Sequence, residues 1–124
     1  AAAAAGWILR GHGSLSLTDR ANGAYLGEVG IYQPAHYPEP ELGWILVAEA
    51  EGRGLAREAA QAVRDWAYRE RGLGPLVSYI DPSNHRSIRL AERLGAVLDK
   101  NAPTPGGDAC LVYRHIRTQF VRRS

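Results

Sequence analysis

The sequence predicts an α/β fold built on a mixed, mostly antiparallel sheet with one parallel β-α-β crossover and flanking helices. Two observations lead to this fold class. Short segments with strand patterns surround two segments whose apolar residues recur at helical spacing. The first of these helices connects two buried strand segments, and such a unit places its two strands parallel through a right-handed crossover.

A hairpin is predicted near the start of the chain. Residues 14–18 alternate leucine with other residues, which is the pattern of a half-buried strand. Asn22-Gly23 follows and supplies the positive φ angles that a tight reversal needs, so a second strand is expected to return over residues 25–32. Residues 33–40 contain three prolines, which cannot donate to a sheet, and are expected to form a loop.

The parallel crossover is expected between residues 42–47 and 76–80, two compact apolar segments. The helix between them follows the turn Glu51-Gly52-Arg53-Gly54 and stops at Gly72. Its apolar residues form one stripe at a period of 3.6 residues: Leu55, Ala59, Ala62, Val63, Trp66 and Ala67.

A second helix and a final strand pair complete the predicted sheet. Residues 81–84 form a turn that caps a helix over residues 85–94, and Gly95 ends that helix. Residues 96–98 and 110–113 are expected to pair antiparallel, joined by a loop rich in proline and glycine.

The composition is that of one folded domain spanning residues 1–124. Of the 124 residues, 45% are hydrophobic and 23% are charged, which excludes a disordered chain. No apolar run reaches the roughly 18–20 residues that span a bilayer, so no membrane association is expected. The formal net charge of +2 is too small to indicate nucleic acid as the main partner.

Cysteine and histidine usage bounds the compartment and the metal chemistry. Cys110 is the single cysteine and cannot form an intrachain disulfide, which favours a reducing compartment and a cytoplasmic protein. The four histidines and this cysteine show no metal-ligand spacing, so no metal is expected.

The first residues predict that the chain is incomplete at its N-terminus. The sequence has no methionine and begins with five alanines, which we interpret as stand-ins for unassigned residues of a longer protein. Residues 7–10 run into Gly11 and look like the end of a helix.

The stretch that carries chemistry is a strand, a Gly-x-Gly turn and an amphipathic helix. Glycines let the backbone approach an anion, and the free N–H groups of a helix's first turn point toward it. A P-loop would need Lys-Ser/Thr after Gly54, where Leu55-Ala56 stands. A dinucleotide fingerprint would need a small residue in place of Arg57, so both of these phosphate motifs fit poorly.

A third phosphate-binding loop fits better. Residues Glu51 to Ala56, Glu-Gly-Arg-Gly-Leu-Ala, resemble the acetyl-CoA loop of the GNAT superfamily of N-acetyltransferases, whose pattern is Gln/Arg-x-x-Gly-x-Gly/Ala. The strand Glu-Leu-Gly-Trp-Ile-Leu at 41–46 and the segment Asp-Pro-Ser-Asn-His-Arg-Ser at 81–87 are similar to those of its RimJ/RimL-type branch. Glu51 departs from the pattern. The resemblance implies a GNAT-type sheet that lacks its N-terminal strand and helices here.

The resemblance also implies a donor site. Ile45, Leu46 and Val47 would pair with the pantetheine arm of acetyl-CoA as an added strand. Backbone N–H groups around Leu46 and Val47 would hold the thioester oxygen. Asn84 would form a hydrogen bond with the pantetheine, although its position is also explained by a helix N-cap role alone. The pyrophosphate would be held by Gly52, Arg53, Gly54, Leu55 and Ala56.

Two residues are implied in proton transfer. Glu41 is the candidate base, acting directly or through water. The alternative is that Glu41 is a solvated carboxylate at a strand end with no role in catalysis. Ser87 is the candidate proton donor near the sulfur. Trp44 and Trp66 are expected to be core residues rather than residues that stack on substrate.

These roles predict an acetyl-CoA-dependent N-acetyltransferase in which an amine attacks the thioester directly. Cys110 has no base beside it in sequence, which disfavours an acyl-enzyme. The acceptor is a protein N-terminus or a small amine, and the sequence leaves this open. A non-catalytic acyl-CoA-binding or sensing domain and a scaffold without cofactor are the alternatives. A homodimer is compatible with the sequence, and the oligomeric state stays open.

Overall fold

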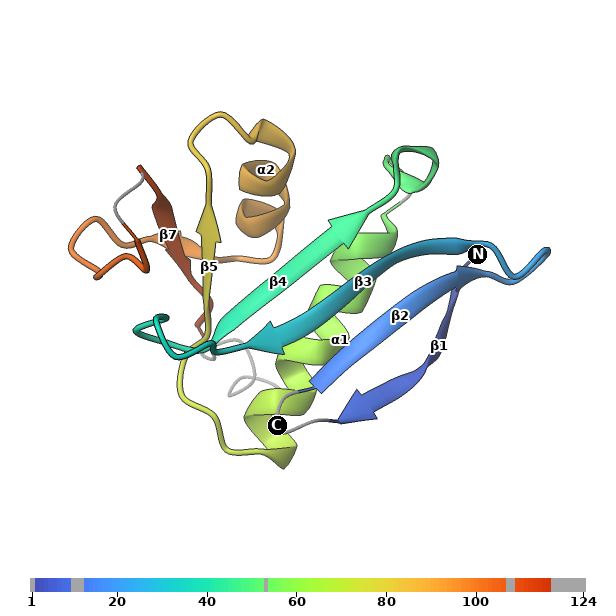
Figure 1. Cartoon of the computed structure of the whole chain (residues 1–124), viewed down its shortest axis with the longest axis horizontal. Coiled ribbons are helices and arrows are strands. Elements are labelled where there is room, and N and C mark those ends of the chain that lie inside the picture. Colours follow the sequence, from blue (N-terminus) through green and yellow to red (C-terminus); the bar gives the residue numbers. More distant parts are fainter. Residues whose placement is uncertain (1, 10–12, 53, 107–108, 117–124) are drawn as a thin grey trace.

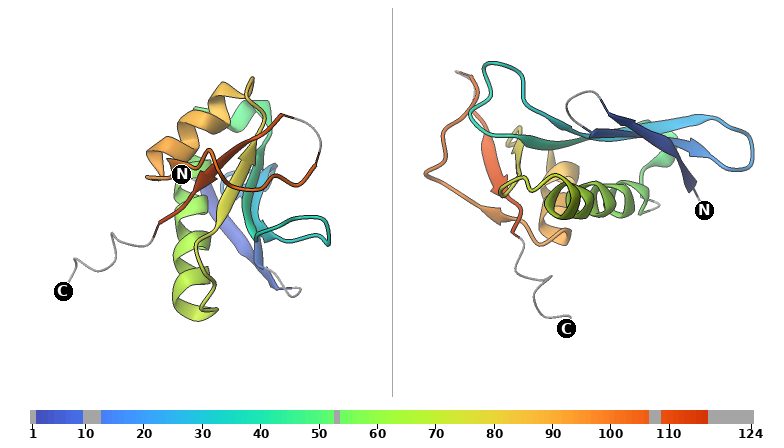
Figure 2. Two further views of the ribbon diagram at one scale, coloured as in Figure 1. Left: turned by 90° about the vertical axis from the view of Figure 1, so that its left-hand side faces the viewer. Right: turned by 90° about the horizontal axis from the view of Figure 1, so that it is seen from below.

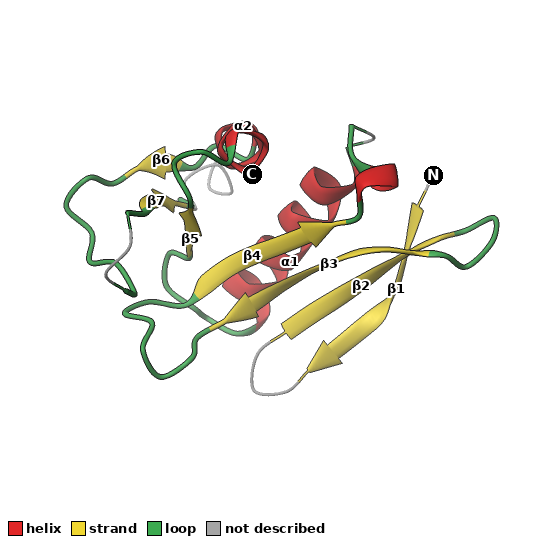
Figure 3. Ribbon diagram, turned by 45° about the horizontal axis from the view of Figure 1, so that its top comes forward, coloured by secondary structure: helices red, strands yellow, loops and turns green. Residues whose placement is uncertain are grey.

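The computed structural model describes residues 2–9, 13–52, 54–106 and 109–116. Within them, seven strands form one sheet in the order β1-β2-β3-β4-β5-β7-β6 (Figures 1 and 3). Neighbouring strands pair antiparallel except β4 and β5, which are parallel, so the predicted fold class is confirmed. The elements are β1 (Ala2–Leu9), β2 (Gly13–Asp19), β3 (Tyr25–Tyr32), β4 (Glu41–Leu46), the 3-10 turn η1 (Ala48–Ala50), α1 (Leu55–Glu70), β5 (Val77–Ile80), α2 (His85–Arg93), β6 (Val97–Leu98) and β7 (Leu111–Arg114).

The N-terminal segment corrects one prediction. Residues 7–10 are expected to end a helix, but Ala2–Leu9 forms β1, which pairs antiparallel with β2. The sheet therefore contains an N-terminal strand where the sequence indicated none. Alanine has little preference for strands, so the ladder with β2 decides this conformation and the local sequence does not. Arg10 and Gly11 lie outside the described residues.

The hairpin between β2 and β3 turns where the sequence predicts. Gly23 adopts a φ of 73°, and no residue other than glycine has a positive φ within the described ranges. Asn22 therefore stabilises the turn in another way. Its side-chain oxygen accepts a hydrogen bond from the Ala24 N–H at 2.9 Å.

α1 covers one face of the sheet, over β2, β3 and β4 (Figure 2). The predicted apolar stripe of this helix is buried at four of its six positions: Leu55, Ala59, Val63 and Ala67. Ala62 is exposed and Trp66 is half-buried, whereas Tyr68 is buried in the core instead. Across from the helix, Val29 and Leu42 are fully buried, and each such side chain contributes about 1.5–3 kcal/mol.

The neighbouring strands β4 and β5 separate toward their C-terminal ends. Their parallel ladder consists of a single residue pair, Glu41 with Val77. Beyond this pair the two strands diverge, and α2 lies beside their open ends (Figure 1). Buried Arg64 of α1 holds the end of α2, because its guanidinium donates to the Leu94 carbonyl at 2.8 Å. Helices in the described part of the chain are too short or too polar to cross a membrane.

Candidate functional site

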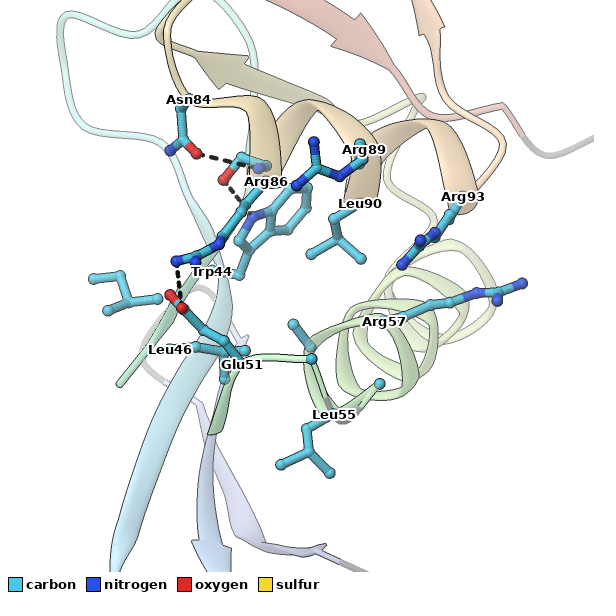
Figure 4. A pocket seen from close by; sticks show the side chains of 15 residues that line it. Trp44, Leu46, Glu51, Leu55, Arg57, Asn84, Arg86, Arg89, Leu90 and Arg93 are labelled. Atoms are coloured by element: carbon cyan, nitrogen blue, oxygen red, sulfur yellow. Dashed lines mark hydrogen bonds and ion pairs between the residues drawn. The ribbon is translucent and has the colours of Figure 1, made fainter. Parts of the chain in front are cut away.

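A cavity of about 620 Å³ lies between the end of β4, the start of α1 and one side of α2 (Figure 4). It brings together eight residues that the sequence predicts for the site: Ile45, Leu46, Gly52, Gly54, Leu55, Ala56, Asn84 and Ser87. Of the other three predicted site residues, Glu41 lines a smaller neighbouring cavity. Arg53 lies outside the described residues, and Val47 is absent from the wall of the cavity.

The glycine turn opens α1 toward this cavity. Gly52 and Gly54 have φ angles of 81° and 77°, a left-handed conformation that residues with a side chain rarely adopt. Gly54 is the N-cap of α1 and provides no side-chain cap, so the first N–H groups of the helix remain available. These donors, together with the positive end of the helix dipole, suit an anion such as a diphosphate.

Four arginines line the same cavity: Arg57 of α1 and Arg86, Arg89 and Arg93 of α2 (Figure 4). The three on α2 follow each other at spacings of three and four, which places them on one face of the helix. Arg86 forms an ion pair with Glu51 of the glycine turn. Sequence reasoning missed this cationic wall, although the arginine spacing on a predicted helix is a signal that could have found it.

The edge of β4 beside the cavity carries unpaired peptide groups. In an antiparallel pair, successive residues point their N–H and C=O groups alternately toward and away from the partner strand. The Val47 N–H donates to the Leu26 carbonyl at 2.9 Å, on the side of β3. The Leu42 carbonyl accepts from the Ser78 hydroxyl of β5 at 2.6 Å, on the opposite side. By this alternation, Trp44 and Leu46 also turn their peptide groups away from β3, toward the split.

This geometry corrects the predicted oxyanion donors. The Val47 N–H already bonds to Leu26 and is not available to a ligand. The Leu46 N–H points toward the split between β4 and β5, where the ladder has ended. Of the two residues named from the sequence, only Leu46 offers a donor at this edge of the sheet.

A smaller cavity of about 130 Å³ lies in the split itself and adjoins the first, sharing Trp44, Asn84 and Ser87 with it. Glu41 lines this smaller cavity, and its carboxylate accepts a hydrogen bond from the Tyr79 N–H at 3.0 Å. Burial raises the pKa of Glu41 from 4.5 to about 7, and the Tyr79 hydrogen bond offsets part of that increase. Glu41 is therefore not a fully solvated carboxylate.

Asn84 and Ser87 stand at the junction of the two cavities. The Asn84 side-chain oxygen accepts from the Ser87 N–H at 3.2 Å, so Asn84 caps α2. Because this cap uses the oxygen, the amide N–H donors are the part of Asn84 that can bind a ligand. The Ser87 hydroxyl oxygen accepts from the indole N–H of Trp44 at 3.1 Å (Figure 4). Trp44 thus joins the core to the site, whereas the sequence predicted a core role alone.

The loop of residues 33–40 is attached beside the smaller cavity. The ring of Tyr37 meets the ring of Tyr79 edge-on, with centroids 5.3 Å apart. Glu39 forms two hydrogen bonds to Arg114 of β7, at 2.7 and 3.0 Å. The bidentate contact tethers the loop to the far strand pair.

The thiol of Cys110 is poorly suited to nucleophilic chemistry. Burial raises its pKa, and the nearby carboxylates of Glu41 and Asp81 raise it further. A thiol with a raised pKa is largely protonated at neutral pH, and the thiolate is the reactive form.

The comparisons with known proteins agree with this geometry. The sequence profile of the acetyltransferase (GNAT) domain matches residues 1–97. This chain belongs to the GNAT acetyltransferase family. A solved structure, that of the acetyltransferase from Agrobacterium tumefaciens str. C58, is 45% identical with a TM-score of 0.80, covering 86% of this chain and 62% of that one.

Two further relatives match this chain over a smaller share of their length or at lower identity. The GNAT chain is 38% identical over 79 residues to the protein YkkB of Bacillus subtilis, covering 62% of this chain and 46% of YkkB. It also resembles ribosomal-protein-S5-alanine acetyltransferase from Vibrio fischeri, with 20% identity and a TM-score of 0.67 over 83% of this chain and 60% of that one. That second likeness shows the fold alone. The chain spans less than half the length of the curated relatives it matches.

Proposed function

We propose that this GNAT chain transfers the acetyl group of acetyl-CoA to a primary amine by direct attack on the thioester. The observation that carries the proposal is the junction of two cavities of different character at Trp44, Asn84 and Ser87. The larger cavity is lined by arginines and by the glycine turn. The smaller contains a carboxylate whose pKa lies near 7.

The larger cavity suits the donor by charge and by hydrogen bonding. Acetyl-CoA is a polyanion, and the described residues of the wall include four arginines and one carboxylate, that of Glu51, which pairs with Arg86. The uncapped N–H groups after Gly54, with Gly52, Leu55, Ala56 and the neighbouring Arg53, would hold the pyrophosphate.

The pantetheine arm carries amide groups that need partners. The peptide groups of β4 that face the split, at Trp44 and Leu46, would pair with this arm as a sheet edge pairs with an added strand. Asn84 would donate from its amide nitrogen. Ile45, which is 69% exposed and lines the larger cavity, would flank the arm through its side chain.

The smaller cavity suits an ammonium group. Two acidic residues, Glu41 and Asp81, line it, and none of the described residues that form it is lysine, arginine or histidine. With a pKa of about 7, Glu41 is a base at neutral pH and would accept a proton from the ammonium, directly or through water. The free amine would then attack the carbonyl carbon, while the Leu46 N–H stabilises the oxygen and Ser87 protonates the departing sulfur.

The acceptor belongs to one of two classes. The strand 41–46 and the segment 81–87 support assignment to the RimJ/RimL-type branch. A protein N-terminus is then the expected acceptor. The likeness in fold to the spermidine N-acetyltransferase SpeG of Vibrio cholerae keeps small amines in the panel.

The test is release of CoA thiol from acetyl-CoA with a panel of amines, next to calorimetric binding of acetyl-CoA alone. The panel contains peptides with free N-termini, polyamines and simple alkylamines. We expect Glu41→Gln and Ser87→Ala each to lower turnover by about a hundredfold or more, since proton transfer contributes factors of this size. Glu70→Gln, on the exposed end of α1, is the matched control and should retain full activity.

The outcomes separate the alternatives. Binding of acetyl-CoA without thiol release for any amine would refute catalysis and favour an acyl-CoA-binding or sensing domain. Undetectable binding of acetyl-CoA would refute both and leave a scaffold. A variant at Glu41 or Ser87 with full turnover would remove that residue from the mechanism.

A further inference from the structure

We propose that Trp44 is a positioning residue for Ser87: its indole N–H occupies the acceptor side of the Ser87 hydroxyl and directs the hydroxyl proton toward the junction of the two cavities. This inference rests on the proposed function of Ser87. It adds a residue of β4 to the proton-transfer machinery, although that residue lies 43 positions away along the chain.

The contact determines which way the hydroxyl donates. An indole N–H is only a donor, whereas a serine hydroxyl donates one hydrogen bond and accepts two. The 3.1 Å contact between Trp44 Nε1 and Ser87 Oγ therefore makes the serine oxygen the acceptor. The hydroxyl proton must point elsewhere, and Ser87 lines both cavities.

The backbone of Ser87 is held separately from its side chain. Ser87 is the third residue of α2, and its N–H donates to the capping oxygen of Asn84 at 3.2 Å. With the N–H fixed by Asn84 and the Oγ fixed by Trp44, the side chain has little freedom left. Such a restraint is what a proton donor needs, because efficient transfer depends on a held geometry.

Trp44 is itself held from behind. Its ring packs against both clusters of buried core residues and meets the ring of His115 edge-on, with centroids 6.4 Å apart and planes at 83°. His115 is fully buried in the described structure. The indole is therefore part of the packed interior on one side and of the cavity wall on the other.

The support beneath Trp44 keeps one charge state. The Ser78 hydroxyl donates its single proton to the Leu42 carbonyl at 2.6 Å. Ser78 Oγ lies 2.8 Å from His115 Nε2, so in this second contact Ser78 Oγ accepts from Nε2–H. This contact places a proton on Nε2, and the contact alone is compatible with either charge state of the ring. Burial, with the charge of Arg64, lowers its pKa to about 3, so this support does not titrate near neutral pH.

The indole N–H also acts during the reaction. As the C–S bond of the thioester breaks, its electron pair stays on sulfur, and the Ser87 hydroxyl proton moves to that sulfur. Negative charge then develops on Ser87 Oγ, which the indole N–H stabilises more strongly than the neutral hydroxyl. Ser87 recovers a proton from water, and the proton released by the amine leaves through Glu41.

The test compares Trp44→Phe with Trp66→Phe, the same change in a half-buried tryptophan of α1 outside both cavity walls. We expect Trp44→Phe to lower kcat about tenfold, the effect of one lost hydrogen bond to a developing charge. The KM for acetyl-CoA and the acidic limb of the pH profile near 7 should not move. In a Ser87→Ala background, Trp44→Phe should cause no further loss of kcat.

Two results would overturn the inference. One is a Trp44→Phe loss that is equally large in the Ser87→Ala background, and the other is a change confined to KM. Incorporation of β-(3-benzothienyl)alanine at Trp44 keeps the ring shape without the N–H, and it must reproduce the loss of kcat if Trp44→Phe folds poorly. A wild-type protein that releases no thiol would instead refute the proposed function, and the inference with it.

Discussion

Replacing Glu41 by glutamine should stabilise the protein, and more so as the pH increases. Glu41 begins β4 and lines the smaller cavity, where its carboxylate accepts from the Tyr79 N–H at 3.0 Å. Burial raises its pKa from 4.5 to about 7. Glutamine keeps an oxygen for the Tyr79 N–H but cannot ionise, so the substitution removes the cost of a partly buried charge.

The size and sign follow from the two pKa values. The folded state binds the Glu41 proton more tightly than the unfolded state, so this group stabilises the fold below about pH 4.5. That stability is lost as the pH rises toward 7, and the loss is constant above 7. At about 1.4 kcal/mol per pH unit the full loss is about 3 kcal/mol, and solvent at the open side of the cavity reduces it. We expect Glu41→Gln to gain about 2 kcal/mol on the wild type between pH 5 and pH 8.

Urea unfolding followed by tryptophan fluorescence at pH 5 and pH 8 measures this difference. Glu70→Gln, on the exposed end of α1, makes the same chemical change outside both cavities and serves as the control. A Glu41→Gln advantage that is the same at both pH values would refute the raised pKa. A variant that is less stable than the wild type at pH 8 would show that the ionised carboxylate is stabilising, against the reasoning.

A substitution at Gly27 tests the packing beside the site, and one at His115 tests the pH dependence of stability. A Cβ at Gly27 would lie 2.2 Å from the Ile45 carbonyl oxygen, so Gly27→Ala should cost about 1–3 kcal/mol in urea unfolding and raise the KM for acetyl-CoA. Gly74→Ala, where a Cβ meets open space, should be close to neutral in both measurements, and equal effects at the two glycines would contradict the assigned close approach. His115 has a lowered pKa, so it stabilises the fold above about pH 6.5 and loses that contribution as the pH falls toward 3. His115→Gln should remove this part of the acid destabilisation between pH 7 and pH 5, and an unchanged pH slope would show that His115 is not the group responsible.

Local sequence patterns predicted the structure correctly where the residues that determine it are neighbours in the chain. Gly52 and Gly54 adopt positive φ angles because the turn before α1 requires them, and Asn84 caps α2 through its own helix. The order of strands and helices from residue 13 onward follows from the same kind of information. The stripe of α1 was predicted less well. Ala62 fits the helical period but faces solvent, because the position of the sheet decides which side of the helix is covered.

β1 shows where local patterns carry no information. Its alanines have no strand pattern, and pairing with β2 determines their conformation. Val47 shows the same for the site. Its type and position suggested an oxyanion donor, but the register of β3 on β4 already engages its N–H with Leu26. A register cannot be derived from either strand alone, since it depends on the turn and on the buried face together.

By itself, the sequence determined the fold class, the glycine turn that opens toward an anion and the two candidate proton-transfer residues, Glu41 and Ser87. The fold class and the turn depend on backbone conformations and residue types that neighbouring positions specify, whereas Glu41 and Ser87 were named through the resemblance to the GNAT superfamily. Only the tertiary structure decided the arginine wall, the pKa of Glu41 and the bond from Trp44 to Ser87. Each of these arises where elements distant in sequence meet at the split of β4 from β5. The local charge, the burial and the hydrogen-bond directions depend on how these elements pack together, because packing sets the distances between groups and excludes water from them.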